Sequence, residues 1–427
     1  LFNRSETVLN REEGTMIHYF MSRLLIFNCE KRIKTTGSFR SRKFYLSVCT
    51  AALIILFWVS GQANAGDKYW STSSGNWSDA ANWSLVDPIE PYQPSGLPAD
   101  GDNVHLWSVG SDPLTVYYDN SSSDDVYTHI GIDSLFEDHM ILSMESINGP
   151  ALRSLGMSVG ETAGHYGHVE HSTGLNRVQG DLVLGESTGS DGSYHMQGDW
   201  PASPSLEVGN LIVGDEGRGE FTQQGADSTV IVNGDLEIGK AAFFSSGFYN
   251  LNGGNLSVVG EIKGGLGTSG ININGGTLSA GGDIGVDSFK VGSGEHDTGE
   301  YEHAYGKLLA TSLRVGGGGQ GTFTQRAADP QAPSTSVSNL YVGDQAGSYG
   351  EYFLEGGTLD TDEATIGRSG NGEFTQTGGY HDADDLYLAK YAGSHGTYNL
   401  DGGVLKVSSI DDGDGTGKLS IDRKSVV

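Results

Sequence analysis

Short stretches of alternating apolar and polar residues recur between residues 151 and 410, separated by glycine, aspartate, asparagine and serine. One unit contains three such stretches, at 211–213, 221–223 and 230–232. Alternation with a period of two places successive side chains on opposite faces of a strand, and turn residues mark where strands end. The units show no helical periodicity. Each unit therefore predicts three short strands joined by three bends.

Two sequence anchors give the period of this pattern. The first is a short apolar strand that ends in glycine, as in Leu211–Gly214, and its ten copies end at residues 160, 185, 214, 239, 265, 292, 316, 343, 367 and 389. The second is glycine, any residue and an aromatic residue, and its ten copies begin at residues 167, 192, 219, 247, 270, 299, 321, 350, 372 and 396. In both series nine intervals span 229 residues, a mean period of 25.4 residues. Two independent anchors with one period indicate a repeat array.

Three strands and three bends in about 25 residues make one coil of a solenoid. We therefore predict an all-β fold, a parallel β-solenoid (β-helix) of three-strand coils with an N-terminal cap. Glycine suits the bends because it adopts positive φ without steric cost. The predicted organisation is a presequence at 1–65, a cap with irregular first coils at 66–150, ten repeats at 151–410 and an Asp/Gly-rich tail at 411–427.

Stacking should bring equivalent residues of successive coils into columns. The aromatic position of the second anchor predicts one buried stack: Val169, Tyr194, Phe221, Tyr249, Ile271, Tyr301, Phe323, Tyr352, Phe374 and Tyr398. Two residues later, the copies with Phe-Thr-Gln carry Gln223, Gln325 and Gln376, and they alternate with copies that read Tyr-x-Leu. The glutamines could form a polar binding stripe. Their spacing favours instead buried amides that hydrogen-bond to the coil above or below.

Residues 1–65 have the layout of a secretory presequence. Basic residues at 40–43 precede a 16-residue apolar run at 44–59, and Ala-Asn-Ala at 63–65 predicts cleavage after Ala65. The run is short for a membrane span, and no second run of that length follows residue 66. We expect export to the extracellular space or the bacterial outer surface, with no integral membrane segment in the mature chain.

Removing the presequence leaves 16 basic and 50 acidic residues, a net charge of −34, compared with −29 for the whole chain. This balance argues against binding of nucleic acid or an anionic membrane by charge. Both cysteines, Cys29 and Cys49, lie in the presequence. Disulfides, thiolate nucleophiles and cysteine-based zinc sites are therefore excluded from the mature chain.

Three tryptophans, Trp70, Trp77 and Trp83, lie within fourteen residues of one another at the start of the mature chain. A solenoid needs its open end covered, because unpaired strands and an exposed apolar core invite aggregation. The tryptophans therefore fit a cap. The alternative is an exposed aromatic platform for sugar rings, a candidate glycan-binding site.

The tryptophan-rich entry, the Gly-Asp-Asn-Val at 101–104 and the alternating repeats such as 372–379 and 396–403 resemble bacterial exported glycine-rich β-solenoid proteins, of the PEP-CTERM-sorted and autotransporter-passenger kind. The resemblance covers nearly all of 66–406 and implies structural or surface roles. The chain departs from the family in ending without a C-terminal sorting helix, barrel or anchoring module. Together with a first residue that is not methionine, this predicts a gene fragment with a truncated tail.

No catalytic site is predicted. Lyases and glycosidases built on β-solenoids need a base of tuned pKa with cations, or two carboxylates at a defined separation. Lysine and arginine are scarce here and fall at different places in the repeat, and the acidic pairs at 124–125, 384–385 and 411–412 place neighbouring side chains on opposite faces. We expect a structural or adhesin-like protein without cofactor, apart from weakly bound Ca²⁺, whose partners are extracellular polysaccharide or other envelope proteins. The alternatives are an autotransporter passenger, a glycan-active β-helix enzyme or its carbohydrate-binding spacer.

Acidic residues often precede the first anchor, and stacking should place them in one column about 5 Å apart, where like charges repel. The candidate calcium ligands are Asp181, Asp235, Glu261, Asp283 and Asp385, with Glu363 at the same position. Ca²⁺ would bridge the carboxylates and relieve the repulsion. We expect the melting temperature to be slightly higher in millimolar Ca²⁺ than in excess chelator. An equal melting temperature in both would contradict this prediction.

Overall fold

The computed structural model describes residues 66–71, 74–85, 93, 95–108, 113–119, 125–136, 140–144, 151–198, 203–241, 243–327 and 332–422. The predicted presequence at 1–65 lies outside these residues. The regular secondary structure of the described residues is β-strand, apart from one short 3₁₀ helix, η1 (Ala80–Asn82). The strands are β1 (Asp67–Trp70), β2 (Gly75–Asn76), β3 (Trp83–Ser84), β4 (Asn103–Ser108), β5 (Leu114–Tyr117), β6 (Tyr127–Ser134), β7 (Met140–Met144), β8 (Leu152–Val159), β9 (Tyr166–His171), β10 (Leu175–Leu184), β11 (Asp191–Gln197), β12 (Ser205–Val213), β13 (Arg218–Gln224), β14 (Thr229–Val232), β15 (Leu236–Ile238), β16 (Ser246–Val258), β17 (Ile262–Gly264), β18 (Thr268–Ala280), β19 (Ile284–Val291), β20 (Thr298–His303), β21 (Lys307–Val315), β22 (Gln320–Gln325), β23 (Ser334–Val342), β24 (Tyr349–Leu354), β25 (Thr358–Ile366), β26 (Asn371–Gln376), β27 (Tyr380–Leu388), β28 (His395–Leu400), β29 (Val404–Asp411) and β30 (Thr416–Ile421).

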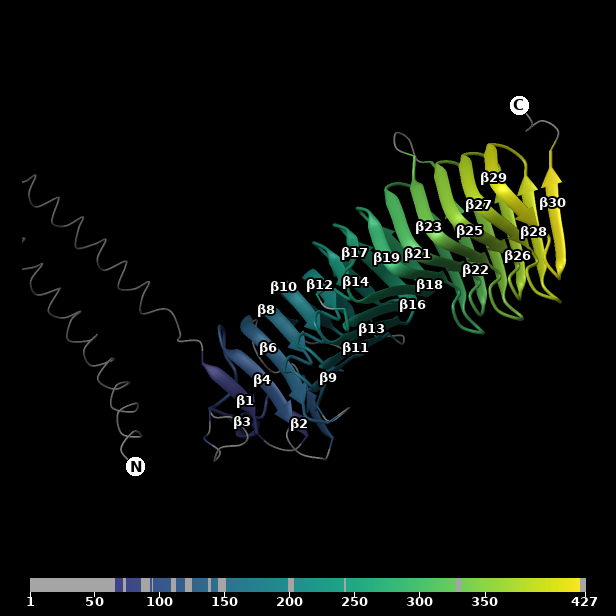
Figure 1. The fold of residues 1–427 in the computed structure, drawn as a ribbon. Coiled ribbons are helices and arrows are strands. Elements are labelled where there is room, and N and C mark those ends of the chain that lie inside the picture. The colour runs from purple at the N-terminus through teal and green to yellow at the C-terminus, as the bar shows by residue number, and fades with distance from the viewer. Residues whose placement is uncertain are drawn as a thin grey trace, which may run out of the picture. The chain divides into compact units, whose positions relative to one another are not determined.

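The strands stack as a parallel β-solenoid of about 12 turns with about 24 residues per coil, which confirms the predicted fold class (Figure 1). β4, β6, β8, β10 and β12 pair in parallel along one face, so the stack already includes strands of the predicted cap region. At the other end β30 pairs with β28, which extends the stack into the predicted tail at 411–427.

Glycine corners turn the chain from one face of a coil to the next. Gly214 and Gly343 end copies of the first anchor with φ of 76° and 74°, in the left-handed region that favours glycine. A Cβ atom at either position would also overlap the backbone of the following coil, at Ser246 and Asn371 respectively. In the last copy Ala389 takes the corner with φ of 57°, the single non-glycine residue with positive φ in the described ranges.

The predicted single aromatic column is in fact two stacks on different faces. The first contains Tyr194, Phe221 and Tyr249, and Ile271 follows in register. Ile271 then pairs with Phe289, which belongs to the first anchor, and not with Tyr301. The second stack lies in the separate sheet of β20, β22, β24, β26, β28 and β30, where Phe323, Tyr352, Phe374 and Tyr398 are stacked with centroids 4.5–4.8 Å apart.

A missing corner causes this shift. Upstream, each coil has a glycine corner and a turn between the strand of the first anchor and the strand of the second, as at Gly239 between β15 and β16. In β19, residues 284–285 continue the face of β17 and residues 288–291 continue the face of β18, with no corner between them. The next corner, Gly292, therefore comes one face later, and every downstream anchor is displaced with it.

The glutamines are buried amides, as the sequence predicts. The Nε2 atom of Gln325 donates to the carbonyl oxygen of Thr358 in the next coil at 2.8 Å, and its Oε1 atom accepts a hydrogen bond from Tyr352 Oη at 2.7 Å. Gln223 pairs in the same way with Tyr249 at 2.6 Å, and Gln376 with Tyr398 at 2.7 Å. The alternation of the two repeat types therefore has a physical basis, since each buried amide needs the phenol of the following coil.

We expect Gln325→Leu and Tyr352→Phe each to destabilise the fold by about 1–3 kcal/mol, because each leaves a buried polar group without its partner. The double variant should lose less than the sum of the two, since neither orphaned group then remains. Thr324→Val, on the solvent side of the same strand, is the matched control. Urea unfolding followed by circular dichroism measures all four chains, and additive losses would show that the pair is not coupled.

Candidate functional site

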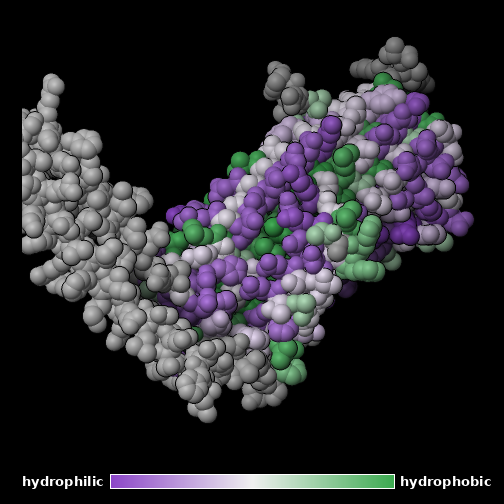
Figure 2. All heavy atoms as spheres, turned by 60° about the vertical axis from the view of Figure 1, so that its left-hand side comes forward, coloured by the Kyte–Doolittle hydropathy of each residue, from purple (hydrophilic) through white to green (hydrophobic). Residues whose placement is uncertain are grey.

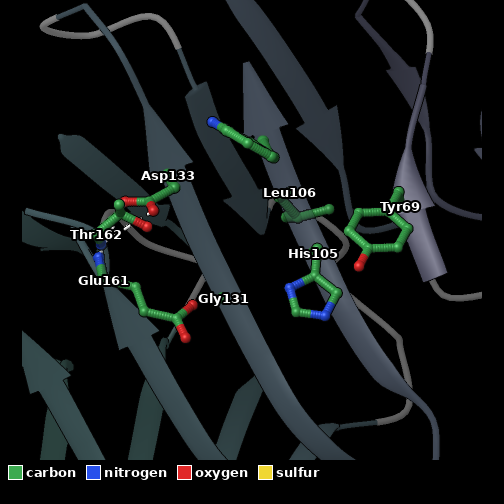
Figure 3. A pocket seen from close by; sticks show the side chains of 8 residues that line it. Tyr69, His105, Leu106, Gly131, Asp133, Glu161 and Thr162 are labelled. Carbon is green, nitrogen blue, oxygen red and sulfur yellow. Dashed lines mark hydrogen bonds between the residues drawn. The ribbon is translucent and has the colours of Figure 1, made fainter. Parts of the chain in front are cut away.

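A hollow with a volume of about 280 Å³ lies on the outer face of the first coils (Figure 3). It is formed by β1, β4, β6 and the corner that follows β8. Its lining combines aromatic rings, a histidine and two carboxylates: Tyr69, His105, Leu106, Trp107, Gly131, Asp133, Glu161 and Thr162.

Strand alternation determines which side chains reach this hollow. In β4 the side chains of Val104 and Leu106 are buried, whereas His105 and Trp107 face outward. Parallel pairing places Tyr69 and Gly131 on either side of His105. The rings of Tyr69 and His105 stack with their centroids 4.7 Å apart.

Glu161 follows the corner glycine of β8 and directs its carboxylate back across β6 (Figure 3). A Cβ atom at position 131 would collide with Glu161 Oε2, so glycine at this position makes room for the carboxylate. His129 Nε2 lies 3.7 Å from Glu161 Oε2. The nearby imidazole of His129 lowers the pKa of Glu161, with a further contribution from the charge of His105, so that the carboxylate is ionised.

Asp133 takes a corner position that glycine holds in later coils, and its carboxylate organises the turn. It accepts backbone hydrogen bonds from Glu161 at 2.9 Å and Thr162 at 3.0 Å. His165 Nδ1 lies 3.6 Å from Asp133 Oδ2. Burial raises the pKa of Asp133 to about 6, although its contacts with Thr162 and His165 oppose that rise.

The hollow therefore holds two carboxyl groups whose pKa values are shifted in opposite directions. Near pH 6 Glu161 is an anion, whereas Asp133 exchanges a proton. This arrangement can bind a hydroxyl-rich ligand by hydrogen bonds, and it resembles the separation of acid and base roles between carboxyl groups. Within the described ranges, no group of three or more histidine and carboxylate side chains is placed to hold a metal ion.

Sequence reasoning missed this hollow because its residues come from four separate segments in the irregular first coils. The anchors are weak there, so the register that places residue 105 beside residues 69 and 131 cannot be read from the chain. A usable signal is the pair Asp133-Ser134, which replaces the corner glycine at the end of a copy of the apolar strand.

The tryptophans do not form the candidate glycan platform. Trp70, Trp77 and Trp83 are each no more than 1% exposed. Trp83 meets the other two edge-on at centroid distances of 5.1 and 4.9 Å, and its Nε1 atom donates to the carbonyl oxygen of Trp77 at 2.9 Å. Apolar burial thus places all three indoles inside the first coils, where they close the core.

The predicted acidic column is divided by the shift between faces. Asp385 lies beside Glu363 on the downstream face. The other candidate ligands follow one another along the upstream coils, with Asn210 between the first two: Asp181, Asp235, Glu261 and Asp283.

Hydrogen bonds relieve the repulsion that suggested calcium. Asn210 Nδ2 donates to Asp181 Oδ1 at 2.8 Å, and the backbone N–H of Glu261 donates to Asp235 Oδ1 at 2.9 Å. Lys263 lies 2.7 Å from Asp235 and 3.2 Å from Glu261. Stabilisation by calcium stays a prediction, but the upstream column has charge-compensating partners of its own.

Comparisons with known proteins give no relatives: no family model matches the chain, and neither a curated protein nor a solved structure resembles it significantly. In the described part of the chain, no helix has the length and apolar character to cross a membrane.

We expect the Asp133 carboxyl to make stability depend on pH in an unusual direction. Its pKa is about 6 in the folded chain and 3.8 ordinarily, so the folded state binds more protons than the unfolded state between these values. Stability from this group is therefore highest near pH 4 and falls as the pH rises to 6. Asp133→Asn removes the titration while keeping an acceptor for the turn.

Melting temperatures measured from pH 4 to pH 7 test this. The wild-type curve should fall relative to that of Asp133→Asn across pH 4–6, and the two should run parallel above about pH 7. Parallel curves throughout would show that Asp133 titrates normally. Asp125→Asn, at a carboxyl with more exposure in the neighbouring segment, serves as the control.

Proposed function

We propose that this chain is an exported bacterial repeat protein that acts as a structural or adhesive element at the cell surface and has no catalytic activity. The observation that carries the proposal is the in-register stack itself. Equivalent outward side chains recur in adjacent coils, as in the Asn250–Asn272 and Asn252–Asn274 amide pairs at 2.6 and 2.9 Å. Such a surface favours many weak contacts with a repetitive partner over one tight contact in a pocket.

The surface and the composition support this role. Polar residues cover most of the face in Figure 2, and apolar residues appear there only in small scattered patches. The mature chain has no cysteine, and its high negative charge keeps a long repeat protein soluble. The presequence layout at 1–65 supports export, and the partners that fit are extracellular polysaccharide or other envelope proteins.

One observation favours a second candidate, a glycan-active enzyme. The hollow beside His105 contains Asp133 and Glu161, whose pKa values are shifted apart as in acid–base pairs. The structural use of Asp133 weighs against it, because a carboxylate that accepts two backbone hydrogen bonds is held in the turn and is poorly placed to exchange protons with a substrate.

Two measurements test the proposed function. Expression of the full chain in a bacterial host should yield a surface-bound or released protein whose N-terminal sequence starts at Gly66, as cleavage after Ala65 requires. The purified protein should release no reducing or unsaturated ends from a panel of neutral and acidic polysaccharides. An uncleaved chain in the cytoplasm would contradict export, and release of sugar ends that Glu161→Gln abolishes would establish the enzyme instead.

A further inference from the structure

Four basic side chains gather on one face of the downstream coils, contrary to the sequence-based expectation that lysine and arginine fall at different places in the repeat. Lys290, Arg314 and Tyr341 are consecutive partners in the register of β19, β21 and β23. Arg368 and Lys390 each follow a corner residue in the next two coils. The mature chain has only 16 basic residues against 50 acidic ones, so this grouping creates a local positive area on an acidic protein.

Aromatic rings and one buried carboxylate hold the two guanidinium groups in place. Arg314 and Arg368 lie on Tyr341 at 5.5 and 4.9 Å from the ring centroid, and Arg368 also lies 5.9 Å from the ring of Tyr391. Asp344, whose side chain is 2% exposed, accepts from Arg368 at 2.8 Å and lies 3.4 Å from Arg314. We call Lys290, Arg314, Tyr341, Arg368 and Tyr391 the cation–tyrosine row.

The cations of the cation–tyrosine row outnumber the carboxylates that are free to neutralise them. Arg314 and Arg368 share the carboxylate of Asp344, whose charge also acts on Lys290. Glu363, the other carboxylate that acts on Arg368, is already paired with Lys390. Within the described ranges no salt bridge within 4.0 Å involves Lys290. Burial, together with the charge of Arg314, lowers the pKa of Lys290. Both guanidinium groups keep about a third of their side-chain surface exposed, so donors remain accessible to a ligand.

Lys390 extends the same surface by one coil but is already paired. Its Nζ atom lies 2.6 Å from Glu363 Oε1 and 4.1 Å from the ring centroid of Tyr387. In the next coil the register places Asp411 beside Tyr387, and the positive area ends there. Five register positions from residue 290 to residue 387 span about 19 Å at 4.8 Å per strand. A surface of this length suits an extended chain.

We propose that the cation–tyrosine row binds a polysaccharide chain that carries carboxylates, running along the stack of coils. The two guanidinium groups supply planar, forked donors that match carboxylate geometry. The tyrosine faces supply apolar area against which sugar rings pack. This inference rests on the proposed function, because export is what brings the row into contact with such a polymer. The net charge of −34 disfavours nucleic acid, which binds through many contacts between phosphates and basic residues.

Affinity electrophoresis and calorimetry with polygalacturonate at about 0.15 M salt, where the repulsion by the acidic surface is screened, test the proposal. Lys290→Gln should weaken binding by about tenfold, because it removes a cation that forms no salt bridge within the described part of the chain. Lys307→Gln makes the same change of charge on an exposed residue of β21 outside the row and should leave binding nearly unchanged. Neutral dextran should not bind to any of the chains.

A second variant separates recognition from folding. Arg368→Lys keeps the positive charge beside Asp344 but loses the fork, so binding should weaken severalfold while the circular dichroism spectrum and melting temperature stay close to wild type. Equal losses of affinity for Lys290→Gln and Lys307→Gln would show that binding depends only on net charge. That result would contradict the proposed role of the cation–tyrosine row. Tighter binding to single-stranded DNA than to polygalacturonate would also overturn it. If the row does not bind polygalacturonate but the exported chain is still found at the cell surface, the proposed surface role stands. A chain that stays in the cytoplasm would contradict both proposals.

Discussion

Everything in this molecule depends on the in-register stacking of successive coils. A buried residue lies directly between its equivalents in the coils above and below, so a polar group in the core can take its partner from the next coil as well as from its own. The glutamine–tyrosine pairs link successive coils in this way, with hydrogen bonds of 2.6–2.7 Å. His171 takes the place of glutamine beside Tyr194, with its Nδ1 atom 2.8 Å from Tyr194 Oη. The core therefore specifies which coil follows which, because an apolar residue in either place would leave a buried polar group unpaired.

The residues at the corners of the coils give this regular core a surface that differs in charge from place to place. The residue after a corner is charged in seven of the ten copies of the first anchor, and these residues determine much of the charge near the corners: Glu161, Glu186, Asp215, Lys240, Asp344, Arg368 and Lys390. Asp133 goes further by replacing the corner glycine and using its carboxylate to hold the next turn. The corner glycines themselves are constrained by positive φ and by the backbone of the following coil, whereas the residue after the corner can vary the surface without changing the strand pairing.

The sequence predicted the fold class, the period and the buried amides, because these follow from spacing alone. It did not predict the change of face near residue 288, since that depends on the absence of one corner between two short strands. That single change divided both the aromatic and the acidic columns. The three tryptophans were equally ambiguous, because nothing in their spacing distinguishes a closed core from an open platform. The cation–tyrosine row left a visible signal, as Lys290, Arg314 and Tyr341 share the third position from the end of the first anchor. That signal covers only part of the row, because Arg368 reaches it from a corner.

Long-range and short-range electrostatics act in opposite directions on this protein. At low ionic strength the acidic faces repel an approaching polyanion over tens of ångströms, whereas at about 0.15 M salt that repulsion is screened beyond roughly 8 Å. Contacts with partly buried, preorganised guanidinium groups are screened less, because their donors are fixed by Asp344 and Tyr341 before the ligand arrives. The acidic background thus opposes non-specific adhesion of anionic polymers along the whole stack. A carboxylate-bearing chain is held only where cations and rings alternate, so scarcity of positive charge elsewhere is what gives the row its selectivity.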